Sequence, residues 1–386
     1  MADGHSNEES KCDDVRAVLI VSFALDDNLF DSSHVIRDLT FEVLTRDEYW
    51  RFVRQTWGDV SKENFGSAMR RMFSETPLVF HDLSSISGYL ADICGFKAYG
   101  FYKTLVTEYN EVAGRAFDSG VILGSPDFFS FLQQNRENLE RNGVDVIYLL
   151  VTNKEKSIME TQIAGLIRWN RIPASMFDGM IGWDGKGMTH LYEASANRKP
   201  NTSMIFDAIN NRRTDESKNK VPLIDPARQP VGFMHIGDRM ETDVMLAINM
   251  KSEHKNGMLV AAYLTNTMYT ASKKGYDKLL DIAETCKKVG VRLYMSSTRS
   301  DRRAYDKPWI LDDKLREYGA DVSAFPADHN FSRFHEPKKY RNGNVVEQYR
   351  VAERIHEVGL MLAGEKPDSN PEAGRGRQGG RSNYRV

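Results

Sequence analysis

Carboxylate, hydroxyl, amide and amine side chains follow several apolar runs of this chain. The residues concerned are Asp26, Thr152, Asn153, Lys199, Asp238 and Asp243. Carboxylates can attack phosphorus, exchange protons or bind magnesium, and a nearby cation neutralises the charge of a phosphate group. Phosphoryl transfer through a phosphoaspartate needs a carboxylate nucleophile, a second acid two residues later and such a cation. If these side chains act together, the fold has to bring them to one place.

The apolar runs have the length and composition of parallel strands that helices cover on both faces. Strands are expected over residues 15–23, 144–151, 180–182, 231–236, 257–264 and 291–295. Helices are expected between them, over residues 125–141, 157–169 and 203–210, from residue 241 onward, and over 275–289. This alternation predicts an α/β fold with a doubly wound parallel sheet, in which ligands bind at the carboxyl ends of the strands.

The alternation is interrupted between residues 33 and 116. Segments there, such as 46–54 and 98–106, have apolar residues at helical spacing and little strand alternation. We interpret residues 33–116 as a helical cap inserted after the first strand. The α/β core would then consist of residues 15–32 and 117–299.

Both ends of the chain have the composition of segments without a core. Residues 1–14 are acidic and residues 364–386 are rich in arginine and glycine, so we predict that both are disordered. Residues 300–363 are predicted to form a C-terminal extension that ends in an amphipathic helix over 345–363. Its expected apolar stripe consists of Val345, Tyr349, Ala352, Ile355, Gly359 and Leu362.

The composition is that of an ordinary globular protein. With 386 residues and a formal net charge of -2, the chain has no overall attraction to nucleic acid or membranes. Its 3 cysteines lie far apart, so they offer neither a disulfide framework nor a paired-cysteine metal site, and they fit a reducing compartment. No run approaches the roughly 20 apolar residues that span a bilayer, and the first residues lack the apolar core of a signal peptide. We expect a cytoplasmic protein.

Several motifs occur in a fixed order along the predicted core. Residues 23–32 read F-A-L-D-D-N-L-F-D-S, residues 152–154 read T-N-K, residues 199–200 read K-P, and residues 237–243 read G-D-R-M-E-T-D. This set resembles the haloacid dehalogenase (HAD) superfamily, in its phosphoglycolate-phosphatase-like branch. The usual first motif of that family is F-D-x-D-G-T-L-x-D-S, and the resemblance covers about residues 17–265.

The resemblance implies a role for each acidic position. The residue at position 24 would be the nucleophile, and Asp26 would be the general acid and base. Asp238 and the main-chain carbonyl of Asp26 would bind Mg²⁺, which prefers oxygen ligands. Asp243 would be a supporting or alternate metal carboxylate.

The resemblance also implies a phosphate-binding set. Thr152, with Asn153, would hydrogen-bond a phosphate oxygen, and Lys199 would neutralise the phosphate. Taken singly, these residues have simpler interpretations, because Gly-Asp after a strand often forms a turn and Thr152-Asn153 could cap a helix. His235 lies within an apolar run and is interpreted as a packed core residue.

The first motif departs from the family pattern at three positions. Ala24 stands where the nucleophile belongs, Asp27 replaces the usual glycine, and Asn28 replaces the usual threonine or valine. The sequence therefore favours a pseudo-phosphatase that binds a phosphate or Mg²⁺ ligand, or a protein partner, without efficient turnover.

Two alternatives remain open. The first is an active Mg²⁺-dependent phosphohydrolase for a small phosphometabolite or nucleotide, with a displaced carboxylate such as Asp27 as the nucleophile. The second is RNA association through the arginine- and glycine-rich tail, whose composition is typical of flexible RNA-contacting segments.

Overall fold

The structure is a computed structural model of the chain. It describes residues 16–26, 28–29, 32–75, 83–113, 123, 126–170, 174–183, 198–205, 209, 224, 229–254, 257–265, 273–296, 308–323 and 340–364. The acidic segment 1–14, residues 365–386 of the tail, and Asp27 lie outside these ranges. Within the described ranges, no helix has both the length and the hydrophobicity that a membrane crossing requires.

The core is a single seven-stranded sheet with the strand order β3-β2-β1-β4-β5-β6-β7, and every pairing is parallel. The strands are β1 (Ala17–Phe23), β2 (Val144–Glu155), β3 (Gly179–Trp183), β4 (Val231–Gly237), β5 (Met258–Leu264), β6 (Val291–Ser296) and β7 (Ala320–Ser323). All residues of β1 and β4 are buried, as their continuous apolar character predicted. The predicted doubly wound α/β fold is confirmed.

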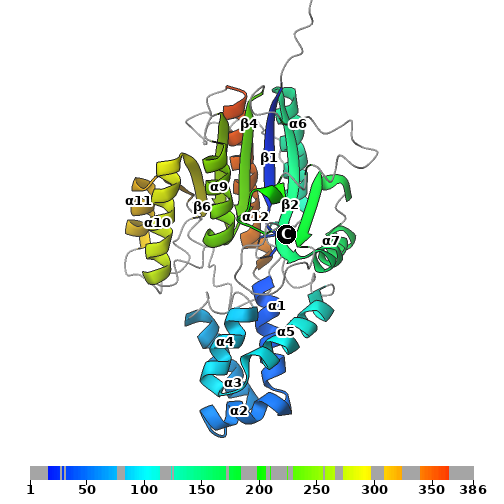
Figure 1. The fold of residues 1–386 in the computed structure, drawn as a ribbon, viewed down its shortest axis with the longest axis vertical. Coiled ribbons are helices and arrows are strands. Elements are labelled where there is room, and N and C mark those ends of the chain that lie inside the picture. Colours follow the sequence, from blue (N-terminus) through cyan, green and yellow to red (C-terminus); the bar gives the residue numbers. More distant parts are fainter. Residues whose placement is uncertain are drawn as a thin grey trace, which may run out of the picture.

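Helices cover both faces of this sheet (Figure 1). One face packs against α6 (Pro126–Arg141) and α12 (Tyr340–Leu362). The other face packs against α9 (Met245–Glu253), α10 (Lys273–Val289) and α11 (Pro308–Glu317). Helix α6 ends where the sequence predicted, because Gly143 adopts a positive φ of 77° and its N–H donates to the Glu140 carbonyl.

The order of the strands reverses at β1. From β1 the chain builds β2 and β3 on one side, then returns to place β4 on the other side and continues outward to β7. Val21 of β1 therefore pairs with both Tyr148 of β2 and Met234 of β4. In such sheets the crevice at the carboxyl ends beside the reversal is the usual place for ligands.

A bundle of helices lies at the carboxyl-end edge of the sheet (Figure 1). It consists of α1 (Ser32–Leu44), α2 (Asp47–Trp57), α3 (Lys62–Glu75), α4 (Leu83–Cys94) and α5 (Ala98–Ala113). The predicted cap thus consists of helices joined by short turns in its described residues. Its aromatic residues form its own core, in which the rings of Tyr49 and Phe101 lie 5.0 Å apart in an edge-to-face contact.

The sheet does not end at residue 299, where the sequence predicted the core to end. Helix α11 and strand β7 follow, and β7 pairs with β6 through Leu293 and Ala320. The first part of the predicted extension is therefore one more helix-strand unit of the core. Its strand has 4 residues in a charged segment, which is too short to give a clear periodic signal.

The apolar stripe of α12 differs from the predicted one. Val351, Ile355 and Val358 are fully buried, whereas Tyr349 is 50% exposed and touches Phe131 of α6 only at a ring edge. The predicted placement of Tyr349 in the buried stripe is wrong. Its half-exposed ring instead lies against Phe131 at the rim of the contact between α12 and α6.

Two glycines allow α12 to lie close to the core. A methyl group added at Gly359 would lie 2.4 Å from Leu139 of α6, and one added at Gly232 of β4 would lie 2.4 Å from Leu362. Helix α12 therefore approaches α6 and the central strands more closely than any side chain at these two positions would permit.

Candidate functional site

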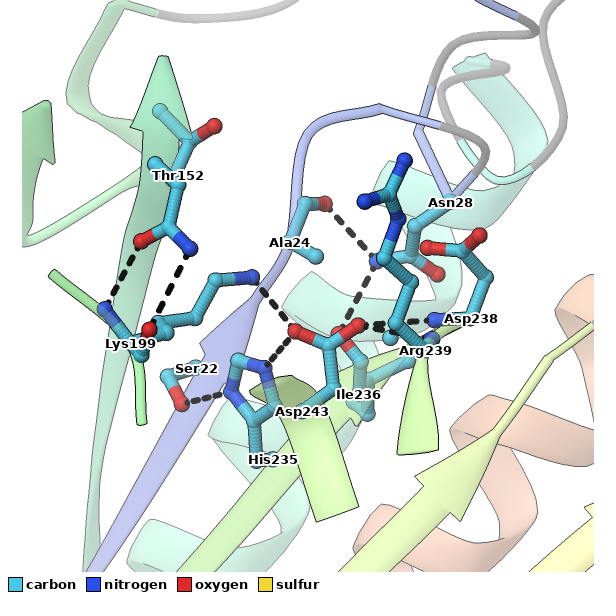
Figure 2. A network of polar contacts seen from close by, with 12 residues as sticks. Ser22, Ala24, Asn28, Thr152, Lys199, His235, Ile236, Asp238, Arg239 and Asp243 are labelled. Atoms are coloured by element: carbon cyan, nitrogen blue, oxygen red, sulfur yellow. Dashed lines mark hydrogen bonds and ion pairs between the residues drawn. The ribbon is translucent and has the colours of Figure 1, made fainter. Parts of the chain in front are cut away.

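Ala24 lies where the chain leaves β1, and it is fixed to the neighbouring strand β4. Its N–H donates to the Ile236 carbonyl at 2.8 Å. The buried side-chain amide of Asn28 donates to the Ala24 carbonyl at 2.8 Å and to the Ile236 carbonyl at 3.2 Å. The loop after β1 is thus held by Asn28, and the buried position 24 presents only a methyl group to the site (Figure 2).

Asp26 forms a partly buried ion pair with a lysine that the sequence-based site did not include. Lys154, from the end of β2, places its ammonium group 2.5 Å from Asp26 Oδ1. The Ser32 hydroxyl also donates to Asp26. The same ammonium donates to the hydroxyl of Tyr109 at 2.8 Å and to Gln162 Oε1 at 2.9 Å. Lys154 is the third residue of the T-N-K motif, and this motif was the only indication in the sequence that Lys154 belongs to the site.

The ion pair controls the protonation of both partners. Burial acts to raise the pKa of Asp26, but the charge and hydrogen bond of Lys154 and the Ser32 hydroxyl outweigh it, so the pKa is lowered. Burial acts to lower the pKa of Lys154, but the Asp26 charge and the bond to Tyr109 outweigh it, so that pKa is raised. Asp26 is therefore an ionised, paired carboxylate, which is the wrong protonation state for a general acid.

Asn153 acts on the main chain of Lys199. Its Oδ1 accepts the Lys199 N–H at 2.7 Å, and its Nδ2 donates to the Lys199 carbonyl at 3.3 Å. The amide of Asn153, expected to contact phosphate, thus holds the segment that carries Lys199. The Lys199-Pro200 peptide bond is cis.

Asp243 collects the hydrogen bonds of four donors (Figure 2). Its Oδ1 accepts from Lys199 Nζ at 2.5 Å and from His235 Nε2 at 3.1 Å. Its Oδ2 accepts from the main-chain N–H groups of Asp238 and Arg239, each at 3.0 Å. Burial alone would raise the pKa of Asp243, but Lys199 and His235 hold it far below its usual value.

The turn after β4 leaves space for the Asp243 carboxylate because position 237 has no side chain. A methyl group added at Gly237 would lie 2.2 Å from Asp243 Oδ2. The carboxylate then meets the N–H groups at the start of the short π-helix η4 (Met240–Val244). The G-D-x-x-x-x-D spacing of the sequence therefore has a structural basis in this turn.

Ser22, His235 and Asp243 are connected in a hydrogen-bonded chain. His235 Nδ1 lies 2.6 Å from the Ser22 hydroxyl, and its Nε2 contacts Asp243. Such an order of serine, histidine and acid is used in nucleophilic catalysis. Here all three side chains are at most 2% exposed, so no substrate reaches the serine. The expectation that His235 is a packed core residue is confirmed, and the sequence did not indicate its two polar partners.

Thr152 and Asp238 complete the set at the carboxyl ends of β2 and β4. Both side chains are buried. The Thr152 hydroxyl oxygen accepts the N–H of Lys154 at 3.2 Å, which leaves the Thr152 O–H as a donor. The structure thus brings positions 24 and 26, Thr152, Asn153, Lys199, Asp238 and Asp243 to one edge of the sheet.

The donor set at this edge does not fit a resident magnesium ion. Both oxygens of Asp243 are used by four protein donors, and position 24 has no carboxylate, so only Asp238 and the main-chain carbonyl of Asp26 remain of the expected ligands. Among the described residues, no group of three or more His, Cys, Asp or Glu side chains could hold a metal ion. Asp238 alone is a poor site for Mg²⁺, which usually needs one or two carboxylates together with substrate phosphates.

Comparison of the chain with protein-family models and with curated proteins finds no match. The fold and the site define a doubly wound α/β protein with a polar cluster at its topological switch point. The HAD superfamily remains a resemblance carried by the motifs.

Proposed function

We propose that this protein is a pseudo-phosphatase, a HAD-like protein that binds a phosphate-bearing ligand without hydrolysing it. The observation that carries the proposal is the state of the acidic residues. Position 24 has no carboxylate, Asp26 is paired with Lys154, and Asp243 is bonded to four donors. None of these positions offers a carboxylate for attack on phosphorus, and loss of a covalent nucleophile costs several orders of magnitude in rate.

Binding is supported by the donors at the same edge of the sheet. The Thr152 hydroxyl, the ammonium groups of Lys154 and Lys199, and the guanidinium of Arg239 come from the ends of β2 and β4 and from the segment around Lys199. Such donors suit phosphate oxygens. Lys154 and Lys199 are already paired with Asp26 and Asp243, so a phosphate group would share their positive charge with these two carboxylates.

Two measurements on the full chain test this proposal. A panel of phosphomonoesters with Mg²⁺ should show no turnover above buffer, and Asp26→Asn should give the same baseline. Inorganic phosphate without Mg²⁺ should raise the melting temperature, since a ligand at 100 times its Kd stabilises the folded state by about 2.7 kcal/mol. Chloride at equal ionic strength is the control.

The outcomes separate the two parts of the proposal. Turnover that Asp26→Asn abolishes would contradict the assignment as a pseudo-phosphatase and favour the displaced-carboxylate enzyme. If phosphate raises the melting temperature no more than chloride does, phosphate is excluded as the ligand, and a protein partner becomes the favoured alternative. Asp27 and Arg375–Arg385 lie outside the described residues, so these alternatives, like a cytoplasmic location, stay predictions of the sequence.

A further inference from the structure

The ammonium group of Lys154 joins the cap to the core. It donates to Tyr109 on cap helix α5, to Gln162 on α7 (Lys156–Asn170) and to Asp26 in the loop after β1. The ring of Tyr109 also lies 4.8 Å from the ammonium group. An ammonium group has three N–H donors, and all three have an acceptor here.

Helix α5 is the part of the cap that meets the two lysine-bearing segments. Tyr102 lies seven residues before Tyr109, so both project from the same side of the helix. Tyr102 lies close enough to Arg198, the residue directly before Lys199, to act against the burial that lowers the pKa of Arg198. The same side of α5 therefore reaches the Lys154 position through Tyr109 and the Lys199 segment through Tyr102.

The contacts of Lys154 divide into one that crosses to the cap and two that do not. If α5 moves away, Lys154 loses the Tyr109 hydroxyl and ring but keeps Asp26 and Gln162. The buried charge is then still paired, so separation avoids the large cost of an isolated ion in the interior. Full separation of an ion pair would be prohibitive, whereas loss of one hydrogen bond and one ring contact is within the range of reversible motions.

We propose that Tyr109 and Lys154 form a latch that holds the cap closed on the carboxyl-end edge of the sheet. Access to the cluster around Lys154 then depends on how often this contact breaks. The inference does not depend on the ligand or on whether the site hydrolyses phosphate, because it rests only on contacts between α5 and the core.

The test measures how fast Lys154 reacts with an amine-acetylating reagent, with mass spectrometry to locate the modification. The Lys154 side chain is only 11% exposed and its three N–H donors are bonded, so its reaction rate should rise with the open population. Tyr109→Phe keeps the ring but removes the hydroxyl, and we expect Lys154 to react about tenfold faster, as for loss of a hydrogen bond to a charged donor. Lys251, whose ammonium donates to the Met258 carbonyl far from the cap, reports on general loosening.

Tyr99→Phe is the matched control, since Tyr99 is on the same helix and is 78% exposed. Faster reaction of Lys154 in Tyr109→Phe alone, with Lys251 unchanged, supports the latch. An unchanged Lys154 rate in Tyr109→Phe overturns it. Equal acceleration of Lys154 and Lys251, or equal acceleration in Tyr99→Phe, also overturns it, because Tyr109 would then act only as a packing residue.

Discussion

The ammonium group of Lys199 lies 2.5 Å from Asp243 Oδ1, and both side chains are buried. A charge in this position is tolerable only while its partner is present, because water cannot replace the lost interaction. The pair therefore makes the folded state dependent on a residue that the resemblance assigns to ligand binding.

Lys199→Met should destabilise the protein by up to about 3–5 kcal/mol, the usual cost of removing one partner of a buried ion pair, because Asp243 keeps three neutral donors but loses its positive partner. Urea unfolding of the two proteins measures the difference. Lys288→Met is the control, because Lys288 pairs with Glu284 on the exposed surface of α10, at 2.7 Å. Its expected cost is about 0.5 kcal/mol or less. Equal effects would show that the Lys199 pair is not a structural requirement.

Gly237→Ala should destabilise the protein, because its methyl group would lie 2.2 Å from Asp243 Oδ2. Overpacking of this kind typically costs about 1–3 kcal/mol, and here it also displaces a carboxylate with four donors. Gly88→Ala in α4 is the control, since an added methyl group there meets nothing within 4 Å. Replacing glycine by alanine in a helix should stabilise Gly88→Ala by up to about 1 kcal/mol. A Gly237→Ala protein as stable as the wild type would refute the close-approach argument.

Stability should fall as the pH drops below 6.5, and His235 should account for part of that fall. Burial lowers the pKa of His235 from its usual 6.5, although its bond to Asp243 acts in the opposite direction. Below pH 6.5, His235 is protonated in the unfolded chain but stays neutral in the folded chain. The free energy of unfolding therefore decreases as the pH falls from 6.5 toward the folded-state pKa of His235. His235→Gln should show a smaller decrease in unfolding free energy between pH 7 and pH 5. Parallel pH profiles would exclude His235 as the cause.

Asp243 and Asp26 should make the stability of the protein decrease further at more acidic pH. Their pKa values are lowered in the folded protein, so their contribution to stability is complete above the usual value of 3.8 and declines below it. Asp243→Asn should therefore flatten the stability profile below about pH 4, relative to its own stability at pH 7. An unchanged slope in this range would contradict the depressed pKa of Asp243.

Ala24→Asp should create a magnesium site that the described residues do not provide. The new carboxylate would join Asp238 at the ends of β1 and β4, which supplies the two acids that Mg²⁺ usually needs. We expect Mg²⁺ to raise the melting temperature of Ala24→Asp but not of the wild type. Ala24→Asn, which has the same shape and no charge, is the control. A magnesium effect of equal size in all three proteins would show that position 24 is irrelevant to metal binding.

The sheet could be predicted from sequence because each strand from β1 to β6 is an apolar run between helical segments. Strand β7 was missed, since its 4 residues carry too little of a periodic signal. Tyr349 was misplaced because helical spacing predicts which side of α12 faces the core but not where the buried part of that side ends. An aromatic ring with a hydroxyl can lie at this boundary.

The site could be located from motifs but its bonding could not. Order and strand context brought Thr152, Lys199 and Asp243 to one edge, as predicted. Which donor meets which acceptor depends on side-chain directions that follow only from packing. Sequence reasoning therefore expected Asn153 to face a phosphate, although it holds the main chain of Lys199, and it did not include Lys154.

The close packing of α12 has a consequence for biosynthesis. Strand β1 is the first described strand in chain order, yet the last described helix, α12, packs in the same apolar cluster as one face of β1. Domains made N-terminus first usually fold as their parts emerge. Here α6 can cover part of this face early, but the part that α12 covers has to wait for more than three hundred further residues. A chain that stops before α12 would therefore leave apolar side chains of this face uncovered beside α6.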